Sequence, residues 1–215
     1  MRRLLSLAML IAACASISLA QSTDDYNKYD IFVGYSHNRV DTGIGDNDPQ
    51  LDDIFDEREG FHGFNASVTG NFSRYVGLKG DLSGHWKTKT FPLTGTTASI
   101  ELDSSLYNFL GGVQLKDNSK ETRFKPFAHA MAGIAHGKVE GNFSNDVCIA
   151  VFPSPCPVDF EESDTGFAAA FGGGLDIRAS ERVDIRAFQL DYNPTRLFDG
   201  GTQHNFRIGV GIVFR

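Results

Sequence analysis

Hydrophobic and polar residues alternate along most of this chain, and the last eleven residues, NFRIGVGIVFR, show the pattern most clearly. Every second residue from Phe206 to Phe214 is apolar, while the residues between them are an arginine, two glycines and a valine. A period of two predicts a β-strand with one apolar face. The pattern recurs and predicts eight strands, each of about ten residues or slightly more, over residues 29–39, 61–72, 75–86, 105–116, 124–137, 164–178, 182–192 and 205–215.

Two of these segments depart from simple alternation. In residues 124–137 an alanine-rich row alternates with Phe127, His129 and Met131, so either row could be the apolar face. In residues 182–192 the polar positions change parity halfway, which predicts a β-bulge near Ala187.

The connections between the strands alternate in length, as in an antiparallel meander whose two ends face different surroundings. No segment with a helical period of 3.6 residues is available to cover the apolar faces, and an open sheet with such a face would aggregate. Closure removes the edges. The sequence therefore predicts an all-β fold, an eight-stranded antiparallel up-and-down β-barrel. The expected short turns are 73–74, 116–123 and 179–182, and the long loops are 40–60, 87–100, 137–163 and 193–203.

The apolar face of such a barrel could point inward or outward. An inward apolar face would give a soluble, exported, lipocalin-like barrel that binds a small apolar ligand. Two features favour the outward arrangement, in which the strands are transmembrane. Small residues such as Gly34, Ala168 and Gly211 are frequent at the alternating positions that also carry the polar residues, and small residues suit a narrow interior. Aromatic residues such as Tyr35 and Trp86 tend to end the apolar rows, where bilayer interfaces favour them.

The first twenty residues predict a secretory signal peptide. Arg2 and Arg3 precede a short apolar stretch, and Ser18-Leu19-Ala20 gives the small-x-small pattern of a cleavage site. Cleavage after Ala20 leaves one domain of residues 21–215. An alternative is lipidation at Cys14, which ends a lipobox-like Ile-Ala-Ala-Cys.

Removal of this leader shifts the net charge from −7 to −9, because Arg2 and Arg3 leave with it. Such an acidic chain is a poor partner for nucleic acid. Many of the carboxylates lie in the long loops, but their spacing matches no calcium-loop template. The sequence therefore predicts no metal and no cofactor. The two remaining cysteines, Cys148 and Cys156, are expected to form a disulfide that braces the third long loop.

The eight-strand meander, the signal peptide, FKPFAHAMAGIAHG, GFAAAFGGGLDIR and the closing NFRIGVGIVFR resemble the bacterial outer-membrane β-barrel family of OmpA/OmpX type. The resemblance covers residues 21–215. It implies a barrel, expected to be monomeric, in the lipid of the bacterial outer membrane. It also implies that the barrel assembly machinery reads an aromatic residue near the end of the chain, here Phe214, although Arg215 follows it.

Charged residues of both signs fall on the inward parity of these strands. We expect them to form a network of ion pairs that fills the lumen, because buried charges need partners. The alternative is a conducting pore with a charged constriction. The expected members of the lumen network are Asp30, Lys79, Asp81, Lys116, Asp176, Arg178, Asp184, Arg186 and Arg207.

Some outer-membrane barrels are lipid-modifying enzymes, which need a nucleophile or paired carboxylates beside a histidine at the outer rim. The candidates are His37 beside Ser36, His85 near Ser83, and His204, and none forms a recognisable motif. The sequence therefore predicts a non-enzymatic protein with a structural or interaction role. Its exposed loops would bind an extracellular partner or support envelope integrity, with at most weak porin-like permeability.

Overall fold

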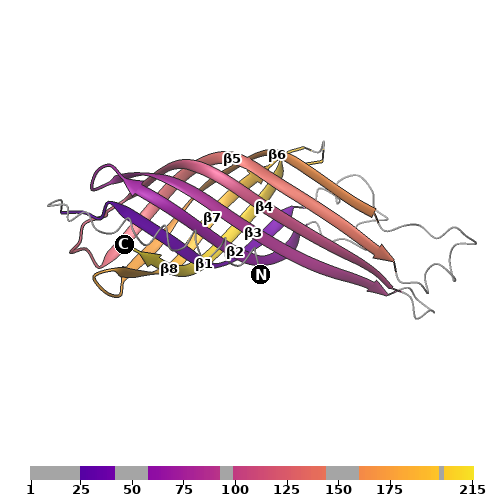
Figure 1. Ribbon diagram of the computed structural model, residues 1–215, viewed down its shortest axis with the longest axis horizontal. Coiled ribbons are helices and arrows are strands. Elements are labelled where there is room, and N and C mark those ends of the chain that lie inside the picture. The colour runs from indigo at the N-terminus through magenta and orange to yellow at the C-terminus, as the bar shows by residue number, and fades with distance from the viewer. Residues whose placement is uncertain (1–24, 42–57, 93–98, 144–159, 199–200) are drawn as a thin grey trace, which may run out of the picture.

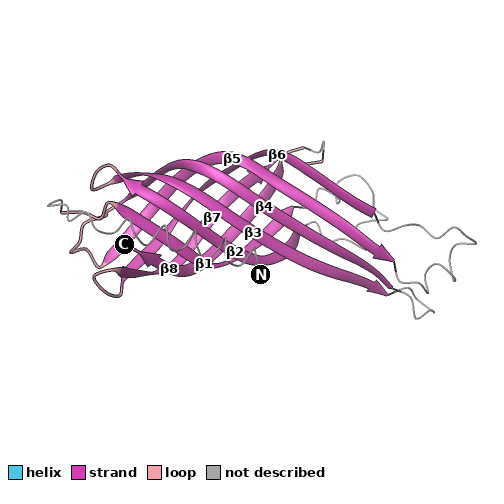
Figure 2. Ribbon diagram, in the orientation of Figure 1, coloured by secondary structure: helices cyan, strands magenta, loops and turns pink. Residues whose placement is uncertain are grey.

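The computed structural model describes residues 25–41, 58–92, 99–143, 160–198 and 201–215, and it is built from eight antiparallel strands (Figures 1 and 2). No helix long and apolar enough to cross a membrane occurs among these residues. The strands are β1 (Tyr29–Asp41), β2 (Arg58–Asn71), β3 (Val76–Pro92), β4 (Ser99–Lys116), β5 (Phe124–Phe143), β6 (Phe160–Arg178), β7 (Val183–Thr195) and β8 (Gln203–Phe214).

Each strand pairs with its neighbours in the sequence, and β8 pairs with β1 to close the barrel. The closing ladder runs from Ile31 opposite Phe214 to Arg39 opposite Phe206. The predicted eight-stranded up-and-down barrel is thus confirmed. We refer to the end of the barrel with the short connections β2–β3, β4–β5 and β6–β7 as the turn end, and to the opposite end as the loop end.

The apolar rows point outward, so the lipocalin-like arrangement is wrong. Ile208 and Val210 on β8 are 49% and 43% exposed, whereas Arg207 between Phe206 and Ile208 is 1% exposed. In strand β5 the row that contains Ala128, Ala130 and Ala132 is exposed on the outside of the barrel. Phe127 and Met131, on the other face of this strand, point into the interior. The open choice of faces in β5 is therefore resolved in favour of large residues inside.

The expected bulge in β7 is confirmed. Arg186 pairs with Asp176 of β6, but the next paired residue on β7 is Phe188, which lies opposite Leu175. Ala187 is the extra residue, and the pairing with β8 shifts at the same place. The bulge lets Arg186 and Asp191 both point inward although their parities differ.

Four strands are much longer than the sequence pattern predicts. Strands β3 to β6 have 17 to 20 residues, whereas β1, β7 and β8 have 12 or 13. Parts of the expected loops 87–100 and 137–163 are therefore strand, including residues 87–92 and 137–143. We name residues 87–92, 99–104, 137–143 and 160–165 the extended sheet; it projects beyond the shorter strands at the loop end (Figure 1).

The extension escaped the sequence pattern because polar residues lie on both of its faces, among fewer apolar residues such as Phe91, Leu102 and Val139. Thr88 of β3 bonds Asp103 of β4 at 2.5 Å, and Lys138 of β5 contacts Glu161 of β6 at 3.1 Å. Such cross-strand pairs stabilise a sheet that water contacts on both sides. Several sequence predictions lie outside the described residues, namely the leader 1–20, lipidation at Cys14, and the disulfide between Cys148 and Cys156.

Candidate functional site in the barrel lumen

Small residues on the inner face leave room for two aromatic rings inside the barrel. A Cβ atom at Gly34 or Gly211 would lie 2.7 or 2.8 Å from the ring of Phe32, and one at Gly174 would lie 2.8 Å from the ring of Phe127. These contacts are too close for a real side chain. The glycines of the inner parity therefore make space for Phe32 and Phe127, which are buried on that same parity.

The turn-end part of the lumen is filled by ion pairs between strands that are not neighbours. The ammonium group of Lys116 on β4 lies 2.9 Å from Asp30 on β1 and 2.8 Å from Asp176 on β6. All three side chains are almost completely buried. Because the pairs join strands on different sides of the barrel, they run across the lumen.

Arg186 continues this arrangement toward the middle of the barrel. Its guanidinium donates two hydrogen bonds to Asp176, at 2.8 and 3.1 Å, and a third to Gln189 at 2.7 Å. The ring centroids of Phe32 and Phe127 lie 4.1 and 4.2 Å from its central carbon. The cation is thus held between two aromatic rings and one carboxylate, a setting that suits the planar guanidinium group.

Arg207 occupies the centre of the lumen. Its Nε and Nη2 atoms donate to Asp191 on β7 at 2.9 and 2.7 Å, and its Nη1 atom donates to Asp81 on β3 at 3.0 Å. Gln189 donates to Asp191 at 2.7 Å, which links this centre to Arg186. Asn65 donates to the second oxygen of Asp81 at 2.9 Å.

Two further groups complete the centre. His129 contacts the second oxygen of Asp191 at 2.9 Å through its Nε2 atom. The ammonium of Lys79 lies 3.3 Å from the Nδ1 atom of His129 and 3.9 Å from Asp81. We call the four cations and four carboxylates of this connected set the charged network: Lys79, Lys116, Arg186, Arg207, Asp30, Asp81, Asp176 and Asp191.

A separate pair of contacts lies at the turn end. Arg215 reaches inward and its guanidinium lies 2.8 Å from Asp184, while the ammonium of Lys125 lies 3.6 Å from the same carboxylate. Phe214, directly before Arg215, faces outward and is 49% exposed. The two residues at this end of β8 therefore face opposite sides of the barrel wall.

The structure places eight of the nine expected lumen residues in buried ion pairs, and Arg178 is the exception. Arg178 is half-buried at the turn end and donates a hydrogen bond to the carbonyl of Lys120 in the neighbouring turn. It is the last residue of β6 and has no buried ion pair among the described residues. The sequence pattern missed Lys125, His129, Asp191 and Arg215; Asp191 was within reach, because the predicted bulge at Ala187 turns it inward.

Beyond the charged network, polar uncharged residues line one side of the lumen. His85 contacts Ser36 at 2.9 Å, and both are fully buried. The side-chain amide of Asn38 has no hydrogen-bond partner among the described residues. This serine and histidine lie inside the barrel and not at its outer rim, where a lipid-modifying enzyme needs such a pair. Ser83, the expected neighbour of His85, accepts a hydrogen bond from Asn108 instead.

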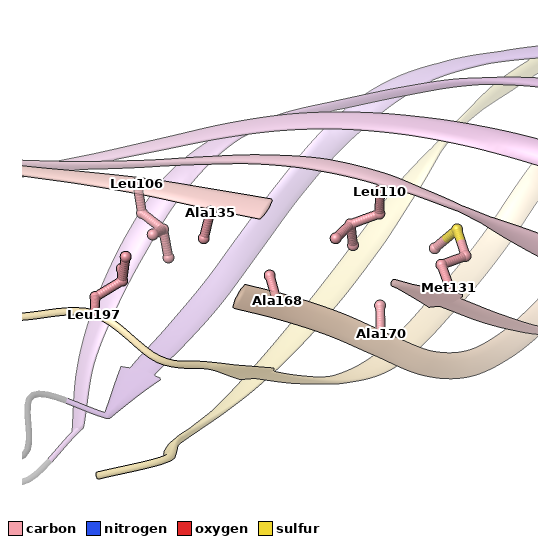
Figure 3. Packing of buried hydrophobic residues seen from close by; sticks show 7 residues of the cluster. All are labelled: Leu106, Leu110, Met131, Ala135, Ala168, Ala170 and Leu197. Atoms are coloured by element: carbon pink, nitrogen blue, oxygen red, sulfur yellow. The ribbon is translucent and has the colours of Figure 1, made fainter. Parts of the chain in front are cut away.

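Apolar side chains fill the other side of the lumen at the loop end (Figure 3). Leu197, from the connection after β7, is 4% exposed and packs into this group. Gly137 makes room for it, because a Cβ atom there would lie 3.1 Å from Leu197. We call the following residues the apolar cluster: Leu106, Leu110, Met131, Ala135, Ala168, Ala170 and Leu197.

The connection that carries Leu197 is fixed by its backbone. Phe198 has φ of 58°, which is uncommon for a residue with a side chain, and its N–H donates to Asp164 of β6. The N–H of Arg196 donates to the carbonyl of Phe167 at 2.9 Å. Two hydrogen bonds to β6 therefore hold Leu197 in place over the apolar side of the lumen.

The arrangement has the features of a filled barrel rather than of a reactive centre. No group of three or more histidine, cysteine, aspartate or glutamate side chains that could hold a metal ion occurs in the described part of the chain. Both oxygens of Asp81, Asp176 and Asp191 accept hydrogen bonds, whereas one oxygen of Asp30 and both oxygens of Asp184 have no hydrogen-bond partner among the described residues.

The comparisons with known proteins agree with this architecture. The family model "Outer membrane protein beta-barrel domain" matches residues 5–214. One similar structure is the crystal structure of Ail, the attachment invasion locus protein of Yersinia pestis, in complex with the heparin analogue sucrose octasulfate. Its TM-score is 0.55, with 18% identity over 86% of this chain and 97% of that chain. A second crystal structure of Ail gives a TM-score of 0.52 at the same identity and coverage.

Neisserial surface protein A is 9% identical over 89% of this chain and 99% of that chain, with a TM-score of 0.49. No curated protein matches the sequence. At these identities the similarity to Ail shows the fold alone.

Proposed function

The chain belongs to the outer membrane protein β-barrel domain family, whose model matches residues 5–214, and on that premise we propose that it is a surface protein with a closed lumen and a structural or interaction role. Membership makes it an outer-membrane β-barrel protein of bacteria. The proposal adds that the barrel is a rigid, non-conducting support, and that its loop end binds an extracellular partner or supports envelope integrity.

The observation that carries the proposal is that two layers of side chains, the charged network and the apolar cluster, lie across the lumen. Arg207 on β8 bonds Asp81 on β3, and Lys116 on β4 bonds Asp30 on β1, so charged side chains cross the barrel from wall to wall. At the loop end Leu197 closes the apolar side. An eight-stranded barrel has little interior beyond its side chains, and these two layers occupy it.

The extended sheet supports an interaction role. Four strands project as one sheet at the loop end (Figure 2), and strands hold binding residues more rigidly than loops do. The surface carries charged side chains that form ion pairs, as Lys138 does with Glu140 on its own strand and with Glu161 across to β6. These features suit a partner that contacts the sheet above the membrane.

The remaining parts of the proposal concern export and assembly. We propose that residues 1–20 are removed after Ala20, that residues 21–215 form one domain, and that Cys148 and Cys156 form a disulfide. Phe214 serves as the aromatic residue read by the assembly machinery. Its outward position is compatible with that role, because Arg215 turns inward and leaves the aromatic side chain exposed.

Single-channel recording in planar bilayers tests the closed lumen. We expect no steady openings from the wild-type protein. Leu197→Ser combined with Arg207→Ser should allow brief openings, because the double variant shortens one side chain in each of the two layers that cross the lumen. Leu190→Ser, which changes an outward residue of β7 that is 51% exposed, is the matched control and should remain closed. Steady openings of the wild-type protein would contradict the closed lumen and favour the porin-like alternative.

Cysteine labelling on intact cells tests the surface orientation. Thr88→Cys lies on the extended sheet, and Ser180→Cys lies in the turn between β6 and β7. A membrane-impermeant maleimide should label the first variant above the wild-type level and leave the second at that level. Equal labelling of both variants, or labelling of Ser180→Cys alone, would contradict the proposed orientation.

A further inference from the structure

Residues 25–28, which precede β1, cross the turn end of the barrel instead of continuing its wall. Tyr26 forms a β-bridge with Ser119, in the connection between β4 and β5. Around the barrel, β2 and β3 separate β1 from this connection in one direction, and β6, β7 and β8 separate them in the other. The segment therefore spans the mouth of the barrel, and we call residues 25–28 the Tyr26 strap.

Two backbone hydrogen bonds flank the bridge. The N–H of Asn27 donates to the carbonyl of Asn118 at 3.1 Å, and the N–H of Lys120 donates to the carbonyl of Asp25 at 3.3 Å. This is the pattern around a non-hydrogen-bonded pair of antiparallel strands, in which the two facing residues lie closest together. The strap thus pairs with the β4–β5 connection as a very short strand.

The other half of the strap is bonded from the lumen. The N–H of Asn71 on β2 donates to the carbonyl of Lys28 at 2.7 Å, and its side-chain amide donates to the carbonyl of Asn27 at 2.8 Å. The hydroxyl of Tyr26 donates to the carbonyl of Phe72 at 3.0 Å. Asn71 is buried on the inner face of β2. Because an inward side chain reaches its backbone, the strap lies over the lumen.

Several buried polar atoms beside the strap have no hydrogen-bond partner among the described residues. They are both side-chain amide atoms of Asn118, the Oδ1 atoms of Asn71 and Asp30, and the Nδ2 atom of Asn27. A buried polar atom without a partner is costly, and water would supply the missing bonds. The closed strap therefore keeps water away from groups that would gain from it.

Few contacts hold the strap to the β4–β5 connection. Its bridge to Ser119 is isolated, whereas the ladder between β8 and β1 continues from Ile31 to Arg39. Segments with few contacts open locally at a lower free-energy cost than the ladders of a sheet. The weak pairing and the unpartnered polar atoms both favour opening of the strap.

We propose that the Tyr26 strap is a gate through which water and small hydrophilic solutes reach the turn end of the lumen. The charged network begins directly behind it, because Asp30 is the second residue after the strap and bonds Lys116, the last residue of β4 before the connection that the strap contacts. When the strap leaves this connection, the amides beside it become hydrated and water reaches Asp30 and Lys116. The rest of the charged network stays in place as a second barrier.

Thiol labelling of the folded barrel in lipid nanodiscs, where both ends of the barrel meet water, tests the gate. Thr69→Cys places a reporter on the inner face of β2, opposite Asp30, at a residue that is 2% exposed. A small cationic methanethiosulfonate reagent should modify this cysteine slowly. In combination with Asn27→Pro the rate should rise about tenfold, because proline has no N–H to donate to Asn118. Peptide mapping by mass spectrometry assigns the label to residue 69.

Two matched controls accompany this measurement. Asn27→Ala keeps the backbone N–H and removes only the side chain, so labelling of Thr69→Cys should not become faster. Thr195→Cys lies at the loop end of β7 and is 1% exposed, and Asn27→Pro should leave its labelling unchanged. Each variant is first shown to be folded by its heat-dependent shift in electrophoresis.

A disulfide lock distinguishes a gate from a permanent plug. Tyr26 and Ser119 face each other across the bridge, and the spacing of such a pair suits a disulfide. In Tyr26→Cys/Ser119→Cys, hydrogen exchange of the Lys120 amide should be about tenfold slower in the oxidised than in the reduced protein, because only the reduced strap can open. The wild-type protein, oxidised and reduced in the same way, controls for the other cysteines of the chain.

Four outcomes would overturn the proposal. Equal labelling of Thr69→Cys with Asn27→Pro and with Asn27→Ala would mean that the strap does not limit access. An equal rise at Thr195→Cys would mean that the proline loosens the whole barrel. Equal exchange of the Lys120 amide in the oxidised and reduced lock would make the strap a fixed part of the wall, and failure of the two cysteines to cross-link would contradict the bridge. None of these outcomes depends on whether the lumen conducts.

Discussion

The lumen of this barrel is filled in two chemically opposite ways. From the turn end to the centre it holds the charged network, in which Arg207 bonds two carboxylates across the barrel. At the loop end one side holds the apolar cluster, closed by Leu197. The charged partners all project from strands, whereas the apolar closure depends on a residue from a connection.

The difference follows from how strictly each kind of contact must be made. A buried charge is costly unless its partner is at hydrogen-bonding distance, so the partners must be held by rigid elements. Apolar packing is less directional, so a side chain from a connection can complete it. Of the two sets of side chains that fill the lumen, the apolar cluster is therefore the one that a movement of a connection could open.

The largest effect is expected from breaking the centre of the charged network. Arg207→Met would leave Asp81 and Asp191 buried without their main cation, and loss of one partner from a buried ion pair costs about 3–5 kcal/mol. Urea unfolding in lipid vesicles, followed by the fluorescence of Trp86, measures the free energy of unfolding.

A combined variant checks the reason for this effect. Arg207→Met/Asp81→Asn/Asp191→Asn removes the unpaired charges as well, so it should be more stable than Arg207→Met alone. If the triple variant were the less stable of the two, the cost would come from lost packing instead of unpaired charge.

The next effect concerns the other face of the same strand. Val210→Arg introduces an arginine three residues from Arg207 but on the lipid side, near the middle of the outward row Phe206–Phe214. We expect a loss of about 2–4 kcal/mol in vesicles, as for arginine at the bilayer midplane. The same unfolding assay applies, and Val210→Leu is the control. An unchanged free energy of unfolding for Val210→Arg would contradict the lipid-facing position.

A smaller effect is expected in the apolar cluster. Leu110→Ala should cost about 2–3 kcal/mol, near the lower end for buried leucine, because the neighbouring connection can partly fill the space. The matched control Leu82→Ala removes the same atoms from a lipid-facing residue of β3 that is 36% exposed, and lipid can replace them. A loss for Leu82→Ala as large as that for Leu110→Ala would contradict the buried role of the cluster.

The sequence was most informative where one face is uniformly apolar. The row around Ile208 and the polarity of Arg207 were enough to predict the strand, its lipid-facing side and the inward charge. The parity change in β7 was enough to predict the bulge at Ala187. Both predictions rest on the strict two-residue period of strands.

The sequence was least informative where residue type and face disagree. Phe32 and Phe127 lie on the inner face although they are large and apolar, and two of the glycines that make room for them, Gly211 and Gly174, are distant in sequence. Lys125 stands at the start of the strand whose faces were ambiguous. The extended sheet carries polar residues on both faces, so little contrast between the faces marks it. Leu197 lies in a connection, where periodicity has no meaning.

The smallest expected effect lies at the turn end, outside the membrane-spanning strands, and it depends on pH. Arg74 donates to Asp117 at 3.0 and 3.3 Å, and this hydrogen bond, helped by the N–H of Ser119, holds the pKa of the Asp117 carboxyl below its usual value. A carboxyl with a lowered pKa in the folded state stabilises the fold above its unfolded pKa of about 4, and the contribution is lost as the pH falls toward the folded value. Asp117→Asn should therefore lower the urea midpoint slightly at pH 6 and by less at pH 3, when each value is compared with the wild-type protein at the same pH. A difference between the two proteins that is the same at both pH values would mean that Asp117 acts through its shape and not through its charge.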